Sequence, residues 1–130
     1  MKKLMCAGLT MAALTVVGLP AARAATSETA LATTDMKQML GAIAHPDYSA
    51  FVAPASDGFK ASVDSKKFGA QAQIIDSKIP LAQPYSVKFI TTQKVGQFIN
   101  YIFEVTLHNG DQVLTSLNLD AGKVAGFHLL

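Results

Sequence analysis

Residues 97–130 read QFINYIFEVTLHNGDQVLTSLNLDAGKVAGFHLL, and two glycine-containing turns within this stretch decide the fold. Apolar residues occupy most odd positions of 99–107 and 113–119, and polar residues occupy most of the even ones. Alternation with a period of two is typical of strands that are buried on one side only. The stretch therefore predicts a three-stranded antiparallel meander.

The first turn, around Asn109-Gly110, determines which residues of the first two strands share a face. A two-residue loop would place the odd positions of one strand beside the even positions of the next. A three-residue loop from His108, with Gly110 as a left-handed bulge, pairs Leu107 with Asp111 and keeps the odd positions together. Because a slip of one residue would turn a whole apolar set outward, we predict the three-residue loop.

The same geometry is predicted for Asp120-Ala121-Gly122, which would pair Leu119 with Lys123. One face of the sheet then carries apolar side chains and two hydroxyl groups, from Ile99, Tyr101, Phe103, Val105, Val113, Thr115, Leu117, Leu119, Ala125, Phe127 and Leu129. We expect helices to cover this face. The opposite face is mixed in polarity, and it is expected either to be solvated or to serve for self-association.

Amphipathic segments precede the meander and predict the helices. Asp35 followed by Gln38 resembles a capping box, so the first helix is expected to begin at Asp35, or alternatively near Ser27. The predicted elements are helices over 35–45, 47–53 and 64–76, and a first strand over 85–92 that turns at 94–96. N-terminal helices packed on a curved antiparallel meander define an α+β fold.

The N-terminus has the organisation of a secretory signal peptide. Met1-Lys2-Lys3 precedes an apolar stretch over 4–19, and Ala22-Arg23-Ala24 supplies the small–x–small cleavage pattern. We predict a signal peptide over 1–24 and a single domain over 25–130. The expected location is the bacterial periplasm or medium, without membrane attachment after cleavage; the alternative is an uncleaved anchor.

Composition after cleavage excludes several classes of function. Cys6 is the only cysteine and lies in the predicted signal, so the mature chain would contain no disulfide. Loss of the two lysines and the arginine of the signal leaves eight lysines against nine acidic residues, a net charge of −1. This charge and the lack of arginine argue against nucleic-acid binding and against bidentate phosphate clamps.

No residue pattern typical of catalysis, a metal site or a cofactor is evident. His45 and Asp47 lack a third ligand, and Glu104 and His128 are expected two strands apart, too far for a hydrogen bond. We therefore predict no catalytic, metal or cofactor residues. If the helices leave the core partly open, a small hydrophobic ligand would be bound by Tyr48, Phe51, Tyr101, Phe103, Thr115 and Phe127; the alternative is a filled core.

The segment Asp47-Tyr48-Ser49-Ala50-Phe51 after the first helix, and the closing Gly-Lys-apolar-x-Gly-apolar strand at 122–127, resemble the nuclear transport factor 2-like superfamily. They are most similar to its small bacterial exported domains of unknown function, over nearly all of 25–130. The resemblance implies a cystatin-like cone of helices wrapped by a curved sheet, often dimeric through the sheet. It implies a non-enzymatic binding or interaction domain, or a small lyase or isomerase of the ketosteroid isomerase type. Such enzymes place Asp or His in the cone, and no residue here is assigned that role.

Two weaker resemblances concern parts of the chain. Gln93-Lys94-Val95-Gly96 is similar to the hairpin of cystatin protease inhibitors, although that pattern has one more residue before its glycine. Residues 101–124 are similar to PepSY domains, which would leave 47–76 unexplained. The functional prediction is an exported, non-enzymatic binding or interaction domain with a small apolar cleft. The alternatives are a small lyase or isomerase of the ketosteroid isomerase type that acts on a hydrophobic ligand, and a protease-inhibitor-like module.

Overall fold

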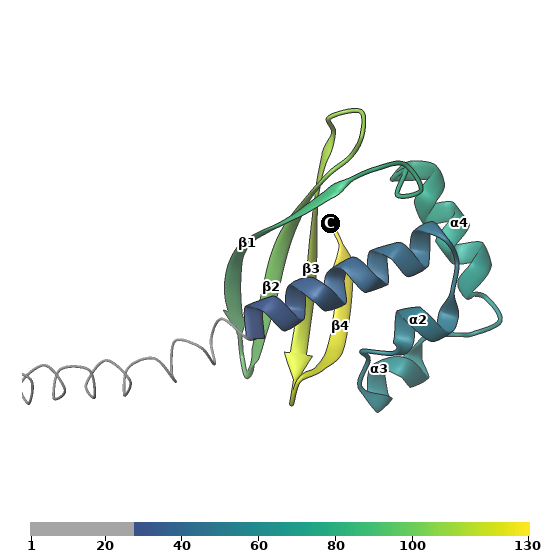
Figure 1. The fold of residues 1–130 in the computed structure, drawn as a ribbon. Helices are drawn as coiled ribbons and strands as arrows, with labels where there is room; N and C mark the ends of the chain where they lie inside the picture. Colours follow the sequence, from purple (N-terminus) through teal and green to yellow (C-terminus); the bar gives the residue numbers. More distant parts are fainter. Residues whose placement is uncertain (1–27) are drawn as a thin grey trace, which may run out of the picture. The chain divides into compact units, whose positions relative to one another are not determined.

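The structure is a computed structural model that describes residues 28–130, so the predicted signal peptide and its cleavage site lie outside the described residues. A first helix covers 28–44 and is followed by α2 (Tyr48–Val52), α3 (Asp57–Ser62) and α4 (Phe68–Lys78). The strands are β1 (Ser86–Val95), β2 (Phe98–Thr106), β3 (Gln112–Asp120) and β4 (Lys123–Leu129). They form one antiparallel sheet in the order β1-β2-β3-β4 (Figure 1). This confirms the predicted α+β class.

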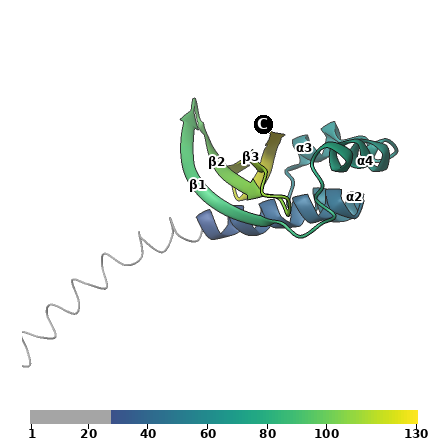
Figure 2. The same ribbon diagram turned by 90° about the horizontal axis from the view of Figure 1, so that it is seen from above.

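The compact unit Leu31–Leu130 has two layers, with the first helix packed on one face of the sheet (Figure 1). Figure 2 shows how strongly β1 and β2 curve. The helix contributes Met36, Met39, Leu40 and Ile43 to the buried core, together with Phe103 of β2. We call this covered side of the sheet the inner face. Within 28–130, no helix has both the length and the apolar character needed to cross a membrane.

The β2–β3 hairpin has the predicted register. Val105 lies opposite Val113, Phe103 opposite Thr115, and Tyr101 opposite Leu117. The Leu107 amide donates to the Asp111 carbonyl at 2.8 Å, and Gly110 adopts a positive φ of 93°. Left-handed backbone is unstrained for glycine, so the three-residue loop with its glycine bulge is confirmed.

The β3–β4 hairpin differs from the prediction. Asp120 pairs with Lys123 across a two-residue turn, in which Ala121 has a φ of 51° and Gly122 a φ of 79°. Two left-handed residues match the twist of the flanking strands, which is why short hairpins favour such turns. The predicted pairing of Leu119 with Lys123 is therefore wrong.

A bulge in β4 then restores the alternation. The register shifts after Asn118, so Ala125 is the extra residue; Val124 pairs with Leu119, and Phe127 pairs with Leu117. Val124 is fully buried, while Ala125, predicted to face inward opposite Leu117, is not part of the buried core. The alternation of apolar residues cannot show where the extra residue of a strand lies. A three-residue turn, and a two-residue turn followed by a one-residue bulge, place the same residues of the later part of the strand on the inner face.

Ile99 is the second residue of the predicted inner face that the structure places differently. It pairs with Lys94 next to the β1–β2 turn, and 41% of its surface is exposed. Residues at the end of a strand have fewer neighbours to cover them than Phe103 has at the centre. The turn itself is the two residues Gly96-Gln97, and Val95 belongs to β1 rather than to the turn.

The starts of two helices and one whole helix were missed, and α4 covers Phe68–Lys78 rather than the predicted 64–76. Asp35 lies inside the first helix, so it is not a cap, and the alternative earlier start is correct. Helix α2 begins as predicted, with the Asp47 side chain accepting from the Ala50 amide at 3.1 Å. Helix α3 was not predicted; the Ser56 hydroxyl caps it by accepting from the Phe59 amide at 3.2 Å.

Candidate ligand-binding cleft

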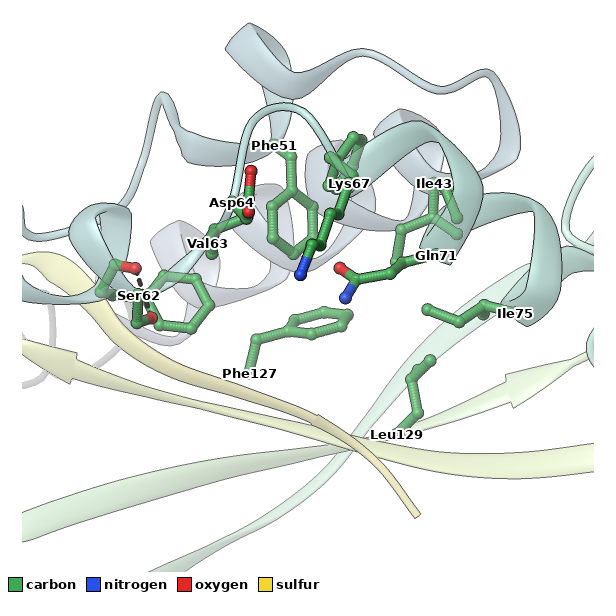
Figure 3. Close-up of a pocket in the computed structure, with 13 residues that line it drawn as sticks. Ile43, Phe51, Ser62, Val63, Asp64, Lys67, Gln71, Ile75, Phe127 and Leu129 are labelled. Carbon is green, nitrogen blue, oxygen red and sulfur yellow. Dashed lines mark hydrogen bonds between the residues drawn. The ribbon is translucent and has the colours of Figure 1, made fainter.

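An open cleft of about 690 Å³ lies among helices α2, α3 and α4 and strand β4 (Figure 3). Most of its wall is apolar, from Ile43, Phe51, Phe59, Val63, Phe68, Ala72, Ile75, Phe127 and Leu129. Its polar residues are Ser62, Asp64, Lys67 and Gln71, all of which are exposed. The volume is in the range of small-molecule sites, about 300–1,000 Å³.

The aromatic wall is organised around Phe51. Its ring centroid lies 4.9 Å from that of Phe68, 5.5 Å from that of Phe127 in an edge-on arrangement, and 6.2 Å from that of Phe59. Aromatic pairs at these separations stabilise one another beyond simple burial. The Asp47 side chain caps the start of α2, which carries Phe51, and the Ser56 hydroxyl accepts from the Phe59 amide.

Helix α4 and strand β4 supply the remaining walls for reasons of periodicity. Phe68, Ala72 and Ile75 follow a spacing of four and three residues, which places them on one side of the helix. On β4, the bulge directs alternate residues, Phe127 and Leu129, toward the helices. Without the bulge, the strand would present the opposite set of side chains to the cleft.

The polar side chains of the cleft are arranged asymmetrically. Figure 3 shows the Lys67 ammonium and the Gln71 amide pointing toward Phe127, whereas the Asp64 carboxylate points away from it. Asp64 Oδ1 accepts from the Lys66 amide at 2.8 Å, and the Ser62 hydroxyl donates to the Phe59 carbonyl at 2.6 Å. Two of the four polar groups are therefore engaged locally, and the two that are directed inward both carry N–H donors, with the Gln71 amide adding one acceptor oxygen.

Of the residues predicted to bind a ligand, the structure brings only Phe51 and Phe127 to the cleft. Tyr101, Phe103 and Thr115 are buried beneath the first helix, where the Thr115 hydroxyl donates to Met36 Sδ at 3.4 Å. Tyr48 packs edge-on against Phe68, with ring centroids 6.1 Å apart, and does not line the cleft. Ligand binding by this set stays a prediction, and the centre of the sheet is occupied by side chains.

The cleft residues of α3 and α4 were not proposed as ligand-binding from the sequence. Phe68, Ala72 and Ile75 form a stripe that is equally typical of a buried helix face. A signal was nevertheless available, since Lys67 and Gln71 are four residues apart and must share one side of α4, next to that stripe. The presence of the cleft itself depends on how the helices pack against one another, and this cannot be predicted from a local sequence pattern.

Asp35 is a buried carboxylate outside the cleft. Only 7% of its surface is exposed, and Oδ2 has no hydrogen-bond partner. Burial raises the pKa of the Asp35 carboxyl, and the nearby positive charge of Lys123 partly offsets this. A raised pKa is a feature of functional carboxylates as well as of structural ones.

The histidines and Glu104 do not line the cleft. His45, His108 and His128 are exposed, and among residues 28–130 no three potential metal ligands cluster. Glu104 pairs with Leu114 on the outer face and accepts from Gln112 Nε2 at 3.3 Å, whereas His128 pairs with Ser116.

Solved structures with a similar fold include two proteins of unknown function. No protein-family profile matches the sequence, and no curated protein matches it. A crystal structure of an uncharacterised cystatin-fold protein from Novosphingobium aromaticivorans is 14% identical, covering 75% of this chain and 96% of that chain with a TM-score of 0.39. An NTF2-like protein of unknown function from Cytophaga hutchinsonii is 12% identical, covering 74% and 85% with a TM-score of 0.37. No family assignment follows from these similarities.

Proposed function

We propose that the chain is an exported, non-enzymatic binding domain of the nuclear transport factor 2-like type, whose cleft takes a small hydrophobic ligand. One observation carries the proposal: the cleft presents a cluster of phenylalanine rings that the helices leave only partly covered. Phe59 and Phe127 line the cleft and are half-buried. Covering apolar surface of this kind contributes roughly 25 cal/mol per Å².

The position of the titratable groups supports binding over catalysis. Among the described residues, the titratable side chains that line the cleft are Asp64 and Lys67, and both are exposed. General acid–base catalysis needs a group with a tuned pKa at the reacting atom. Asp35 has the raised pKa, but it does not line the cleft. The lyase or isomerase alternative would need a path to Asp35, so activity that Asp35→Asn abolishes would favour it.

A matched pair of substitutions on α4 tests the proposal. Gln71→Trp places a large side chain over the opening, whereas Gln73→Trp adds the same side chain at an exposed position outside the cleft. We expect Gln71→Trp to weaken binding of the neutral fluorescent probe N-phenyl-naphthylamine by about tenfold or more, equivalent to ~1.4 kcal/mol. Gln73→Trp should leave it unchanged. Equal binding by both variants, or no binding by the unsubstituted protein, contradicts the proposal.

Export and self-association complete the proposal. The basic, apolar and small-residue segments of 1–24 support export, which the intact mass of the secreted chain tests: retention of Cys6 contradicts cleavage. The outer face of the sheet exposes Val95 and Leu114, which supports a homodimer through this face. Sedimentation of a Leu114→Lys variant tests it, since an unchanged oligomeric state excludes this interface.

The protease-inhibitor alternative has one supporting observation. Gln93 to Gly96 are all exposed at the β1–β2 hairpin, as a wedge would require. The N-terminal segment that would flank such a wedge lies outside the described residues. Failure to inhibit papain-like proteases at micromolar concentration would remove this alternative.

A further inference from the structure

We infer that the ligand of the cleft is an amphipathic carboxylate, whose apolar body lies against Phe51 and Phe127 and whose carboxylate meets Lys67 and Gln71. This inference rests on the proposed function and names the chemical class of the ligand. It is carried by two side chains with N–H donors, one directly before α4 and one on its first turn, that point into the cleft over the aromatic wall (Figure 3).

The two donors are positioned together by the helix. Lys67 directly precedes α4 and Gln71 lies four residues later, which brings their side chains to one side of the helix. A lysine ammonium carries three donors and no acceptor, and the glutamine amide adds two donors. Both side chains can therefore donate to the same pair of carboxylate oxygens; a neutral head group would lack the charge-assisted part of this bonding, and a cationic one would be repelled by the ammonium.

The charge of Lys67 is not used elsewhere in the described chain. No salt bridge to Lys67 occurs within residues 28–130; the one carboxylate among the residues that line the cleft, Asp64, points away from Phe127 and accepts from the Lys66 amide. A single cation beside apolar walls attracts an anion more strongly than it would in bulk water, because the walls exclude part of the solvent. The cleft side of α4 is therefore complementary to one negative charge.

The apolar walls decide what kind of anion fits. Phe127, Ile75 and Leu129 lie below the two donors in the same cleft, and a small hydrophilic anion would leave them uncovered. The mature chain contains no arginine, which is the residue best suited to a dianionic phosphate. A monoanionic head on an apolar body satisfies both parts of the site.

A series of ligands with one apolar body tests the inference in the full mature chain. Isothermal titration with decanoate, decanol and decylamine, each below its aggregation concentration, separates the head group from the tail. We expect decanoate to bind most tightly and decylamine most weakly. Lys67→Ala should weaken decanoate binding by about two- to fivefold, the effect of one exposed ion pair, and should leave decanol unchanged.

Two further variants make the result decisive. Lys67→Glu should reverse the order, so that decylamine binds more tightly than decanoate, and its exposed position preserves folding. Lys66→Ala removes the same charge one residue away from the cleft lining, and should change nothing. If all three ligands bind the unsubstituted protein and Lys67→Glu equally, the carboxylate inference is overturned while the proposed apolar site stands. If none of them binds, the proposed function fails.

Discussion

The clearest test of the sheet assignment compares two neighbours on β2. Phe103 is fully buried on the inner face, where its ring meets that of Phe89 edge-on at 5.8 Å, and it pairs with Thr115 under the first helix. Truncation to alanine removes the transfer free energy of the ring, about 1.5–3 kcal/mol, and leaves a cavity that adds to the loss. We expect Phe103→Ala to lower the free energy of unfolding by about 3–5 kcal/mol.

Glu104 provides the matched control one residue away. It lies half-exposed on the outer face, and its hydrogen bond with the exposed Gln112 side chain measures 3.3 Å. Glu104→Ala should cost about 0.5 kcal/mol or less. The assay is urea denaturation monitored by circular dichroism. The dependence of the unfolding free energy on urea concentration should stay constant, and the midpoint concentration of urea should fall for Phe103→Ala. Small, equal losses at both positions would refute the assignment of the inner and outer faces.

Two further predictions follow from backbone and charge. Because burial raises the pKa of Asp35 above its ordinary 3.8, the protonated form stabilises the fold, and this stabilisation is present in acid and is lost as the pH rises through the raised value. Asp35→Asn should therefore gain stability relative to the unsubstituted protein as the pH increases from about 4 to 7; thermal unfolding at several pH values measures this, and a difference that does not vary with pH would contradict it. Gly122 has a φ of 79°, so Gly122→Ala should destabilise by about 1–2 kcal/mol. Gly58, inside α3 with open space around it, should behave oppositely: Gly58→Ala should stabilise by about 0.4–1 kcal/mol, and losses of the same size at both glycines would show that conformation does not decide the outcome.

The candidate site was only partly predictable. Phe51 and Phe127 were expected in a cleft and line one. Tyr101, Phe103 and Thr115 were expected in the same cleft and are buried instead, since the methionines and leucine of the first helix occupy the centre of the sheet. Whether aromatic residues form a filled core or an open cleft depends on the summed volumes of several elements, which are not local properties.

The sequence by itself determined the α+β order and the β2–β3 register. Both rest on local information: a period of two over 99–119, and Gly110, which adopts the left-handed conformation of the turn without strain. Only the tertiary structure decided the short β3–β4 turn with its compensating bulge, the interior position of Asp35, and the opening beside α4. These depend on contacts between segments far apart in the chain, because the same alternation and the same helical stripe are compatible with more than one packing.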